Sequence, residues 1–274
     1  MKKHLHENNW TVYIDEDIKT LSNEQLIEVA KLVVSNTVVV FENQKLGPDE
    51  QLEICKVIGK VQPTLSERSK HISIRDGILR VTGQKNSDGI PGLFGHKEDL
   101  DWHANQPSNK NRSPLIWLYG ETGTKGSRTS WINNIESYKD LPDELKEELM
   151  GIEVICGYKQ GNYSHSSFFK EHINFDNPIK IVQTNSEGKT GLFFPFLQIF
   201  GFKDKSDEYF KSIMKKLTEH ILQEKYAYHH NWKDGDIVIS EQWLSIHKRW
   251  AFDNMEERIL HRIAFDHNNV YHAV

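Results

Sequence analysis

Apolar residues near the start of the chain recur with the period of an α-helix. Ser22 and Gln25 have the spacing of a capping box, which satisfies backbone N–H groups at the start of a helix. The apolar residues that would share one face of this helix are Leu26, Val29, Ala30 and Val33. The pattern therefore predicts an amphipathic helix that begins just after Ser22.

A β-branched run and a second helical pattern come next. Residues 37–41 read TVVVF, which is typical of a buried strand. Pro48 suits the first turn of a helix, and Gly59 suits its end. Two helices on either side of one strand are therefore expected in the N-terminal part of the chain.

Short strands separated by turn residues dominate the rest of the sequence. They are expected at about 79–82, 115–119, 152–156, 179–183, 192–196, 237–240 and 259–265. Helices are expected at about 142–150 and after the candidate cap Ser206. This pattern predicts a mainly β fold with flanking helices and a double-stranded β-helix core, the jelly roll of cupin-like proteins. Alternating βαβ units are disfavoured because no glycine-rich phosphate loop is present.

Length and composition are those of an ordinary globular protein. The chain has 274 residues, of which 37% are hydrophobic and 27% charged, and it shows no internal repeat or low-complexity linker. We expect one domain over residues 1–274. The net charge of -5 is spread among intermixed acidic and basic residues, so nucleic acid is not an expected partner.

The two cysteines and the lack of a long apolar run bear on metal binding and on the cellular location. Cys55 and Cys156 lie far apart without a CxxC or Cys/His cluster, so both are expected to be thiols in the core and not zinc ligands. No run of about 18 apolar residues is present, so no membrane span is expected. A cytoplasmic location follows as the expectation.

His103 is the first of two histidines that stand out from fourteen. It lies in DLDWHANQP, where side chains at i and i+2 of a strand face the same way. An H-x-D or H-x-E motif there would supply two ligands of the 2-His-1-carboxylate triad that binds non-haem Fe(II). The residue at i+2 is Asn105, and HxN alone is a weak motif that a simple turn would also explain.

The C-terminal region contains further residues that are typical of such an iron site. NWKDGDIVISEQW leads into His247, and Arg258 and Arg262 follow on the expected last strand, RILHRIAF. Residues at even separations share one face of a strand, so the two arginines would lie together. Packing does not explain two arginines on one face of an apolar strand, although a solvated sheet face would.

The sequence resembles the taurine and 2,4-dichlorophenoxyacetate dioxygenases, a family of Fe(II)- and 2-oxoglutarate-dependent oxygenases. The resemblance runs from VVVFENQKLGPDEQLEICKVIGKVQ through WHAN, GTKGSRTSW and NSEGKTGLFF to NWKDGDIVISEQW with its downstream histidine and arginines. Each segment alone is a weak match to the family. Their common order and spacing make the resemblance specific.

The resemblance implies roles for six residues. His103 and His247 would bind iron, with Asn105 at the position of the carboxylate ligand. The hydroxyl of Thr129, in SRTSW, would bind the distal carboxylate of 2-oxoglutarate, Arg262 would pair with the same carboxylate, and Arg258 would be the second arginine of that strand. Fe(II), 2-oxoglutarate and O2 would then oxidise an unactivated C–H bond of a small molecule. Dimers or tetramers are common in the family, so a homo-oligomer is expected only by analogy.

Asn105 leaves several interpretations open. A neutral amide oxygen is a poorer donor than a carboxylate and leaves the site one unit more positive. The enzyme would remain a hydroxylase if Asn105 binds the metal or a metal-bound water, or would resemble halogenases if an anion takes the vacated position. The site would be impaired if the chain is a pseudo-enzyme or an Asp→Asn variant. Asp101 is a further candidate for the missing ligand.

Two other classes compete with an oxygenase. A binding protein could keep the fold and 2-oxoglutarate without oxidation, since fold does not fix function. A metal-free or zinc hydrolase would require an acid/base pair that two histidines and an asparagine do not supply. The primary substrate is not readable from the sequence, although Trp102, Trp131 and the polar segment 156–169 are candidates for its pocket.

Overall fold

Two β-sheets that face each other form the centre of the molecule. The computed structural model describes residues 1–65, 69–108, 114–158 and 172–266, and every structural statement below concerns these residues. The larger sheet has nine strands, in the order β1-β2-β3-β16-β8-β18-β6-β5, with β4 also paired to β18. Their bounds are β1 Lys3–Leu5, β2 Thr11–Ile14, β3 Val38–Phe41, β4 Lys60–Val61, β5 Ser73–Arg75, β6 Ile78–Val81, β8 Leu115–Thr122, β16 Ile237–Glu241 and β18 Ile259–Asp266.

A four-stranded antiparallel sheet, in the order β15-β9-β17-β7, packs against the larger sheet. Its strands are β7 Leu100–His103, β9 Arg128–Asn133, β15 Ala227–Asn231 and β17 Ser245–Arg249. Two smaller sheets consist of β10 Glu153–Tyr158, β11 His172–Lys180 and β14 Ile199–Phe202, and of β12 Val182–Thr184 and β13 Thr190–Leu192.

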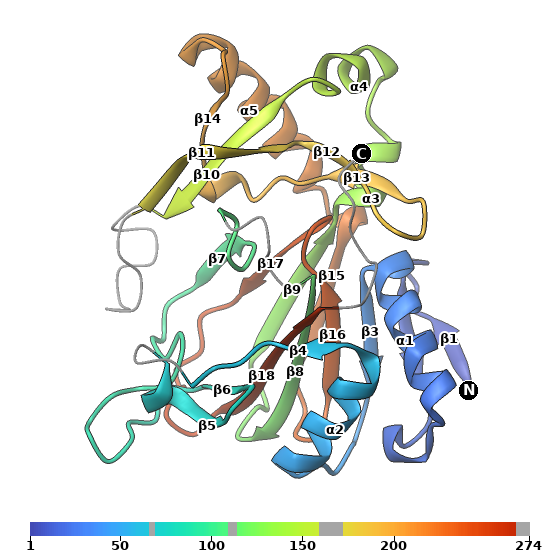
Figure 1. The fold of residues 1–274 in the computed structure, drawn as a ribbon, viewed down its shortest axis with the longest axis vertical. Coiled ribbons are helices and arrows are strands. Elements are labelled where there is room, and N and C mark those ends of the chain that lie inside the picture. The colour runs from blue at the N-terminus through green and yellow to red at the C-terminus, as the bar shows by residue number, and fades with distance from the viewer. Residues whose placement is uncertain (66–68, 109–113, 159–171, 267–274) are drawn as a thin grey trace.

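Helices surround these sheets. The α-helices are α1 Asn23–Asn36, α2 Pro48–Ile58, α3 Asn134–Lys139, α4 Asp143–Leu149 and α5 Asp207–Ile221. The short 3-10 helices are η1 Ile18–Thr20, η2 Lys70–Ile72, η3 Phe196–Gln198 and η4 Glu224–Tyr226. In Figure 1, α1 and α2 lie along one side of the large sheet, while β10, β11, β14, α4 and α5 lie together at the top of the view.

Alternating side chains explain why the large sheet is covered on both faces. Val39 and Phe41 of β3 belong to the apolar cluster that includes α1 and α2. Val38 and Val40, on the opposite face, belong to a cluster that includes Trp131 of the four-stranded sheet. Because successive residues of a strand point to opposite faces, one apolar strand can pack against both layers.

Both N-terminal helices begin where the sequence predicts, and the second also ends there. Ser22 and Gln25 form both hydrogen bonds of the capping box at the start of α1. Pro48 is the first residue of α2, and Gly59 follows its last residue. Cys55 and Cys156 are both buried, as predicted.

Two predicted strands differ from the structure. The strand expected at 192–196 ends at Leu192, and Pro195, which has no N–H to donate to a ladder, directly precedes η3. The strand expected at 179–183 is divided at Ile181. The reason is that the N–H of Ile181 donates to Ile152 O at 3.0 Å, while its carbonyl accepts from Phe193 N at 2.7 Å. The remaining predicted strands are present with shifts of one to three residues at their ends.

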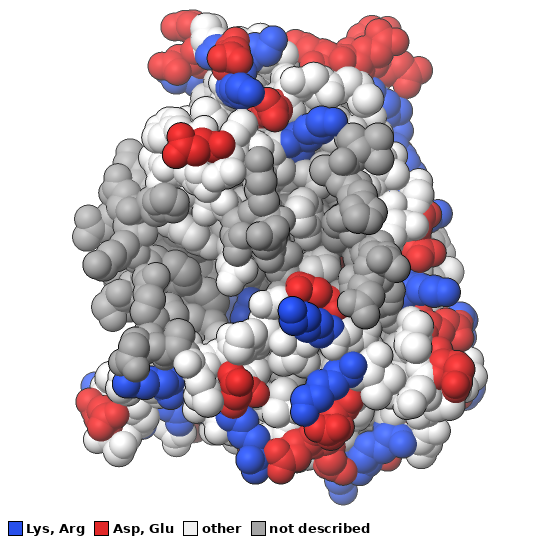
Figure 2. Space-filling view, viewed as in Figure 1, with Lys and Arg blue, Asp and Glu red and all other residues white. Residues whose placement is uncertain are grey.

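Charges of both signs are intermixed on the face that Figure 2 shows. Acidic side chains gather at the upper edge of this view, where Figure 1 places α4, whose sequence is DELKEEL. None of the helices in the described part of the chain combines the length and the apolar character that crossing a bilayer requires.

Candidate active site

A cavity between the two facing sheets contains all six residues to which the family resemblance assigns a role. It has about 530 Å³ of empty space, part of which is open to solvent. Its side chains come from β6, β8, β16 and β18 of the large sheet and from β7, β9 and β17 of the small one. The six predicted residues that line it are His103, Asn105, Thr129, His247, Arg258 and Arg262. Residues far apart in sequence therefore meet in one place.

The pairing of β7 with β17 brings the two histidines together. His103 and His247 are direct partners across these antiparallel strands. Their ring centroids are 4.1 Å apart with an angle of 50° between the planes. Partners across a strand pair point to the same face, so both imidazoles enter the cavity side by side.

Each imidazole is held in its neutral form. Nδ1 of His103 is 2.6 Å from the carbonyl oxygen of Asp101, which can only accept, so Nδ1 carries the proton and Nε2 keeps its lone pair. Burial lowers the pKa of His103 to about 4, with Arg249 and Arg262 adding to the effect. Burial, followed by His103 and Arg262, holds the pKa of His247 well below its usual value. Neutral imidazole is the form that binds metals.

Asn105 lies just beyond the end of β7, in a segment held by two glutamine side chains. Gln198 accepts from Ala104 N at 2.8 Å and donates to Ala104 O at 3.1 Å. Oε1 of Gln242 accepts from the backbone N–H of Asn105 at 3.3 Å and from its side-chain Nδ2. The amide of Asn105 is therefore fixed beside His103 and lines the same cavity.

Two guanidinium groups face the cavity without a carboxylate partner. In the described part of the chain, neither Arg258 nor Arg262 forms an ion pair. Arg258 is 1% exposed, and its Nε donates to Ser127 Oγ at 3.1 Å. Burial lowers the pKa of Arg258 to about 9 and of Arg262 to about 10, so both remain charged at neutral pH. Buried charge without a partner is costly, which indicates that an anion belongs here.

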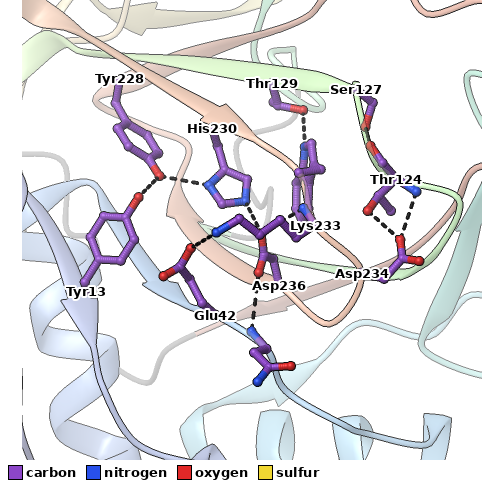
Figure 3. A network of polar contacts seen from close by, with 12 residues as sticks. Tyr13, Glu42, Thr124, Ser127, Thr129, Tyr228, His230, Lys233, Asp234 and Asp236 are labelled. Carbon is purple, nitrogen blue, oxygen red and sulfur yellow. Dashed lines mark hydrogen bonds and ion pairs between the residues drawn. The ribbon is translucent and has the colours of Figure 1, made fainter.

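Thr129 lies on β9, one residue into the strand, and is 3% exposed. Its hydroxyl accepts a hydrogen bond from Trp232 Nε1 at 2.9 Å, so its own proton is available to a ligand in the cavity. Figure 3 shows this contact beside a buried chain in which Tyr228 contacts His230 and His230 contacts Asp236, at 2.9 and 3.0 Å. The network fixes β15 and the turn after it, and with them the position of Trp232.

Arg249 is a third cavity-lining arginine, which the sequence prediction missed. It is 5% exposed and pairs directly with Thr129 across β17 and β9. Its guanidinium donates to the carbonyl oxygens of His96 at 2.7 Å and Glu98 at 2.8 Å, so it also holds the segment before β7. Its position two residues after His247 was the available signal, because residues at i and i+2 share a strand face.

Asp101 does not join the histidines as a third ligand. Its side chain is exposed, and Oδ1 is 3.3 Å from Lys248 Nζ. Within the described ranges, no three His, Cys, Asp or Glu side chains come together as a metal site. Trp131, 1% exposed, lines the cavity, whereas Trp102 packs against a different apolar cluster.

A second cavity adjoins the first and shares four of its residues: Phe94, His103, Asn105 and Arg262. Its other walls come mainly from Leu79, Leu93, Tyr158 and Gln198. Most of the predicted lid segment, residues 159–169, lies outside the described residues. The two cavities therefore meet at His103, Asn105 and Arg262.

The donor set suits a divalent metal and a carboxylate ligand. Two neutral imidazoles and an amide oxygen are nitrogen and oxygen donors of the kind that Fe(II) accepts, although a carboxylate is the usual third donor. The guanidinium groups and the hydroxyl of Thr129 can bind carboxylates through charge-assisted hydrogen bonds. The residues present thus fit both groups.

Comparisons with known proteins identify the family of this chain. Residues 9–264 match the family described as taurine catabolism dioxygenase TauD, TfdA family. The alpha-ketoglutarate-dependent 2,4-dichlorophenoxyacetate dioxygenase of Burkholderia sp. strain RASC is 21% identical over 254 residues, covering 88% of this chain and 86% of that protein. Pentalenolactone F synthase of Streptomyces avermitilis is 21% identical over 269 residues, covering 89% and 86%.

Solved structures share the fold. AAD-2 in complex with Mn(II) and N-oxalylglycine has a TM-score of 0.75 at 16% identity, with 98% of both chains covered. A taurine dioxygenase from Burkholderia xenovorans has a TM-score of 0.74 at 14% identity, with 94% of this chain and 88% of that chain covered.

Proposed function

This chain belongs to the TauD/TfdA family of dioxygenases, and on that premise we propose that it is an Fe(II)- and 2-oxoglutarate-dependent oxygenase that hydroxylates a C–H bond of a small molecule. The observation that carries the proposal is the cavity itself. It combines two adjacent neutral imidazoles with the buried Arg258 and the partly buried Arg262, neither of which has a carboxylate partner among the described residues. We further infer that the two facing sheets are the double-stranded β-helix of this family.

The metal would be held by His103, His247 and Asn105. Both histidines are on strands, and the backbone next to Asn105 is bonded to Gln198, so the three donors are positioned before any metal binds. When bound, the metal and 2-oxoglutarate supply the activation of O2 and the oxidation of the substrate. The protein provides the positions of the donors and a largely apolar cavity.

The co-substrate would lie between the histidines and the opposite end of the cavity. Arg258 bonds Ser127, two residues before Thr129, so these two anion-binding groups are at the same end. The charge of Arg262 acts on both histidines. We therefore assign the distal carboxylate to Thr129 and Arg258, and place Arg262 nearer the metal-binding end. This reverses the roles of the two arginines that the family resemblance implied.

The second cavity is the place we propose for the primary substrate. Leu79, Leu93 and Phe94 give it apolar walls, and His103 and Asn105 also line it. A ligand there would present a C–H bond to the metal while its apolar surface is shielded from water.

A halogenase-like reaction and an impaired 2-oxoglutarate-binding homologue are the alternatives. Halogenation requires an anion at the position of the third ligand, but Asn105 lines the cavity there and is held by Gln242. Hydroxylation is therefore favoured. Product analysis with and without chloride distinguishes the two reactions.

The test is turnover of 2-oxoglutarate. Protein supplied with Fe(II), 2-oxoglutarate and O2 should release succinate slowly without a primary substrate, and His247→Ala should abolish this release. Lys248→Ala is a matched control on the same strand, because its side chain pairs with Asp99 and Asp101 and does not line the cavity. Binding of 2-oxoglutarate without succinate would support the impaired homologue, and absence of both would refute the proposal.

A further inference from the structure

We propose that Gln242 is a positioning residue that orients Asn105 as a neutral amide-oxygen ligand of the metal, so that this site is built for asparagine and is not a damaged aspartate site. The inference rests on the proposed function, because it needs a metal at His103 and His247. It assigns a role to Gln242, which the sequence prediction did not single out.

The orientation of Gln242 follows from the backbone of Asn105. A backbone N–H can only donate, and the N–H of Asn105 lies 3.3 Å from the Gln242 side-chain amide. The atom that faces it must therefore be the acceptor Oε1 and not the donor Nε2. The positions of Oε1 and Nε2 in Gln242 therefore follow from the backbone N–H of Asn105 alone, independently of the Asn105 side chain.

The orientation of Asn105 then follows from Gln242. The same Oε1 also contacts the side-chain amide of Asn105, and an acceptor must be met by a donor, which is Nδ2. The two branches of a planar amide point in different directions, so Oδ1 faces away from Gln242. In the described part of the chain, Oδ1 of Asn105 accepts no hydrogen bond, and Asn105 lines the cavity with both histidines. The geometry thus leaves an amide oxygen for a ligand in that cavity.

Gln242 is itself held firmly. It is 2% exposed and lies in the turn between β16 and β17, and its backbone N–H donates to Pro114 O at 2.9 Å. The buried carboxylate of Glu241 accepts from the backbone N–H groups of Trp243 and Leu244, which fixes this turn. The turn also leads directly into the strand that carries His247. One short segment therefore positions two of the three proposed ligands.

A carboxylate at position 105 would conflict with this arrangement. With Asn105→Asp, an oxygen would replace Nδ2 and face Oε1 of Gln242, so two acceptors would meet. Turning over the Gln242 amide would relieve that contact, but it would bring Nε2 against the backbone N–H of residue 105, so two donors would meet. Either outcome removes a hydrogen bond that the asparagine makes. The glutamine therefore matches asparagine and not aspartate.

The test is a double-mutant cycle on metal affinity, measured with Co(II) under anaerobic conditions without co-substrate. The four proteins are the wild type, Gln242→Met, Asn105→Asp, and the double variant. Methionine keeps the length of the side chain but removes the acceptor. With asparagine at position 105, we expect Gln242→Met to weaken Co(II) binding roughly 10-fold, the usual effect of losing a group that orients a ligand. In the Asn105→Asp background, the same change should leave binding unchanged or strengthen it.

This reversal between backgrounds separates positioning from a merely structural role. A structural role would weaken binding equally in both backgrounds, which would overturn the inference, as would no effect in either. The Co(II) absorption bands should also shift with Gln242→Met when asparagine is present, because the donor set changes. If the methionine variants fail to fold, Gln242→Glu replaces them. It keeps an acceptor, so it should preserve binding with Asn105 and weaken it in the Asn105→Asp background, where two carboxylates would face each other.

The proposed function and this inference fail in different ways. Wild-type protein that binds no Co(II), with His247→Ala as the reference for an absent site, would overturn both. If the wild type binds Co(II) and His247→Ala does not, but the cycle shows no coupling between positions 105 and 242, only the role of Gln242 is overturned.

Discussion

At the scale of the residue, positive charge is the feature that sets what the cavity can bind. Arg249, Arg258 and Arg262 all line it, and Asn105, which also lines it, is a neutral amide. Burial lowers the pKa of each guanidinium, yet none falls near neutrality. A dianionic co-substrate would offset much of this charge, so losing one arginine should affect the part of the ligand that it faces.

Substitution of Arg258 and substitution of Arg262 should differ in which keto acids bind more weakly. We expect Arg258→Met to weaken 2-oxoglutarate binding by roughly 10-fold or more, as for loss of a charge-assisted hydrogen bond. Binding of pyruvate, which lacks the distal carboxylate, should hardly change. Arg262→Met should weaken both ligands. Anaerobic titration of the Fe(II)-loaded variants measures these affinities, and a reversed pattern would restore Arg262 as the partner of the distal carboxylate.

Thr129 should contribute to both binding and stability. In Thr129→Val the ligand loses a donor and Trp232 Nε1 loses its buried acceptor. The unpaired indole N–H should cost about 1–3 kcal/mol of unfolding free energy, and 2-oxoglutarate should bind several-fold more weakly. Thr129→Ser keeps the hydroxyl and is the control. Denaturant unfolding and titration measure the two effects, and equal behaviour of the two variants would show that the hydroxyl has no role.

Side-chain orientation limits what the sequence could predict at this scale. His103, Thr129, His247 and the two C-terminal arginines were located from motif order alone, and all reach the cavity. Gln198 and Gln242 were missed because a glutamine in a short 3-10 helix or in a turn carries no periodic signal. Their function depends on which amide atom faces which backbone group.

At the scale of the element, strands with β-branched runs were predictable, whereas two cavity-lining strands of the small sheet were not. β3 and β16 are apolar on both faces and were found. β9 reads RTSWIN and β17 reads SIHKR, and both were missed as strands. Thr129, His247 and Arg249 line the cavity on one face, and Ser130 and Lys248 are polar residues that do not line it, so neither strand alternates between apolar and polar residues. The strands that carry Thr129 and His247 therefore lack the hydrophobic pattern by which strands are predicted.

The turn between β8 and β9 should position Arg258. Gly123 has φ +63°, and a Cβ there would collide with the backbone carbonyl oxygen of Glu257, beside the backbone of Arg258. Gly126, in the same turn, has φ +87°, but a Cβ would meet only Phe252 at 3.7 Å. Alanine at either position should cost roughly 1–3 kcal/mol of backbone strain.

Gly123→Ala should additionally displace residues 257–258 and weaken 2-oxoglutarate binding, whereas Gly126→Ala should lower only stability. Thermal unfolding and 2-oxoglutarate titration of the two variants test this prediction. Equal co-substrate affinities in the two proteins would mean that the close approach to Glu257 does not position Arg258.

At the scale of the whole molecule, the cavity is a consequence of how two sheets meet. The large sheet supplies Arg262 and the small sheet supplies His103, His247 and Thr129, so ligands bound between them would join the two layers. The mainly β architecture with flanking helices was predicted correctly from strand lengths and turn spacing. The pairing of β7 with β17 was not, because strands about 140 residues apart leave no local signal of their contact.

Ligands that join the two sheets should stabilise the fold as a unit. A ligand at about 100 times its dissociation constant adds about 2.7 kcal/mol to the free energy of unfolding, so Mn(II) with 2-oxoglutarate should raise Tm by roughly 5–10 °C for a chain of this size. His247→Ala should lose this shift. Differential scanning calorimetry measures it, and an equal shift in His247→Ala would place the binding elsewhere.

The most direct test of the central claim is an anaerobic titration of Fe(II) and 2-oxoglutarate into metal-free protein, followed by visible absorption. If iron and co-substrate share the cavity between the sheets, a weak charge-transfer band of the chelate should appear only when both are present and should be lost in His247→Ala. Binding of each ligand without this band would contradict a shared site and would make this member of the family a binding protein.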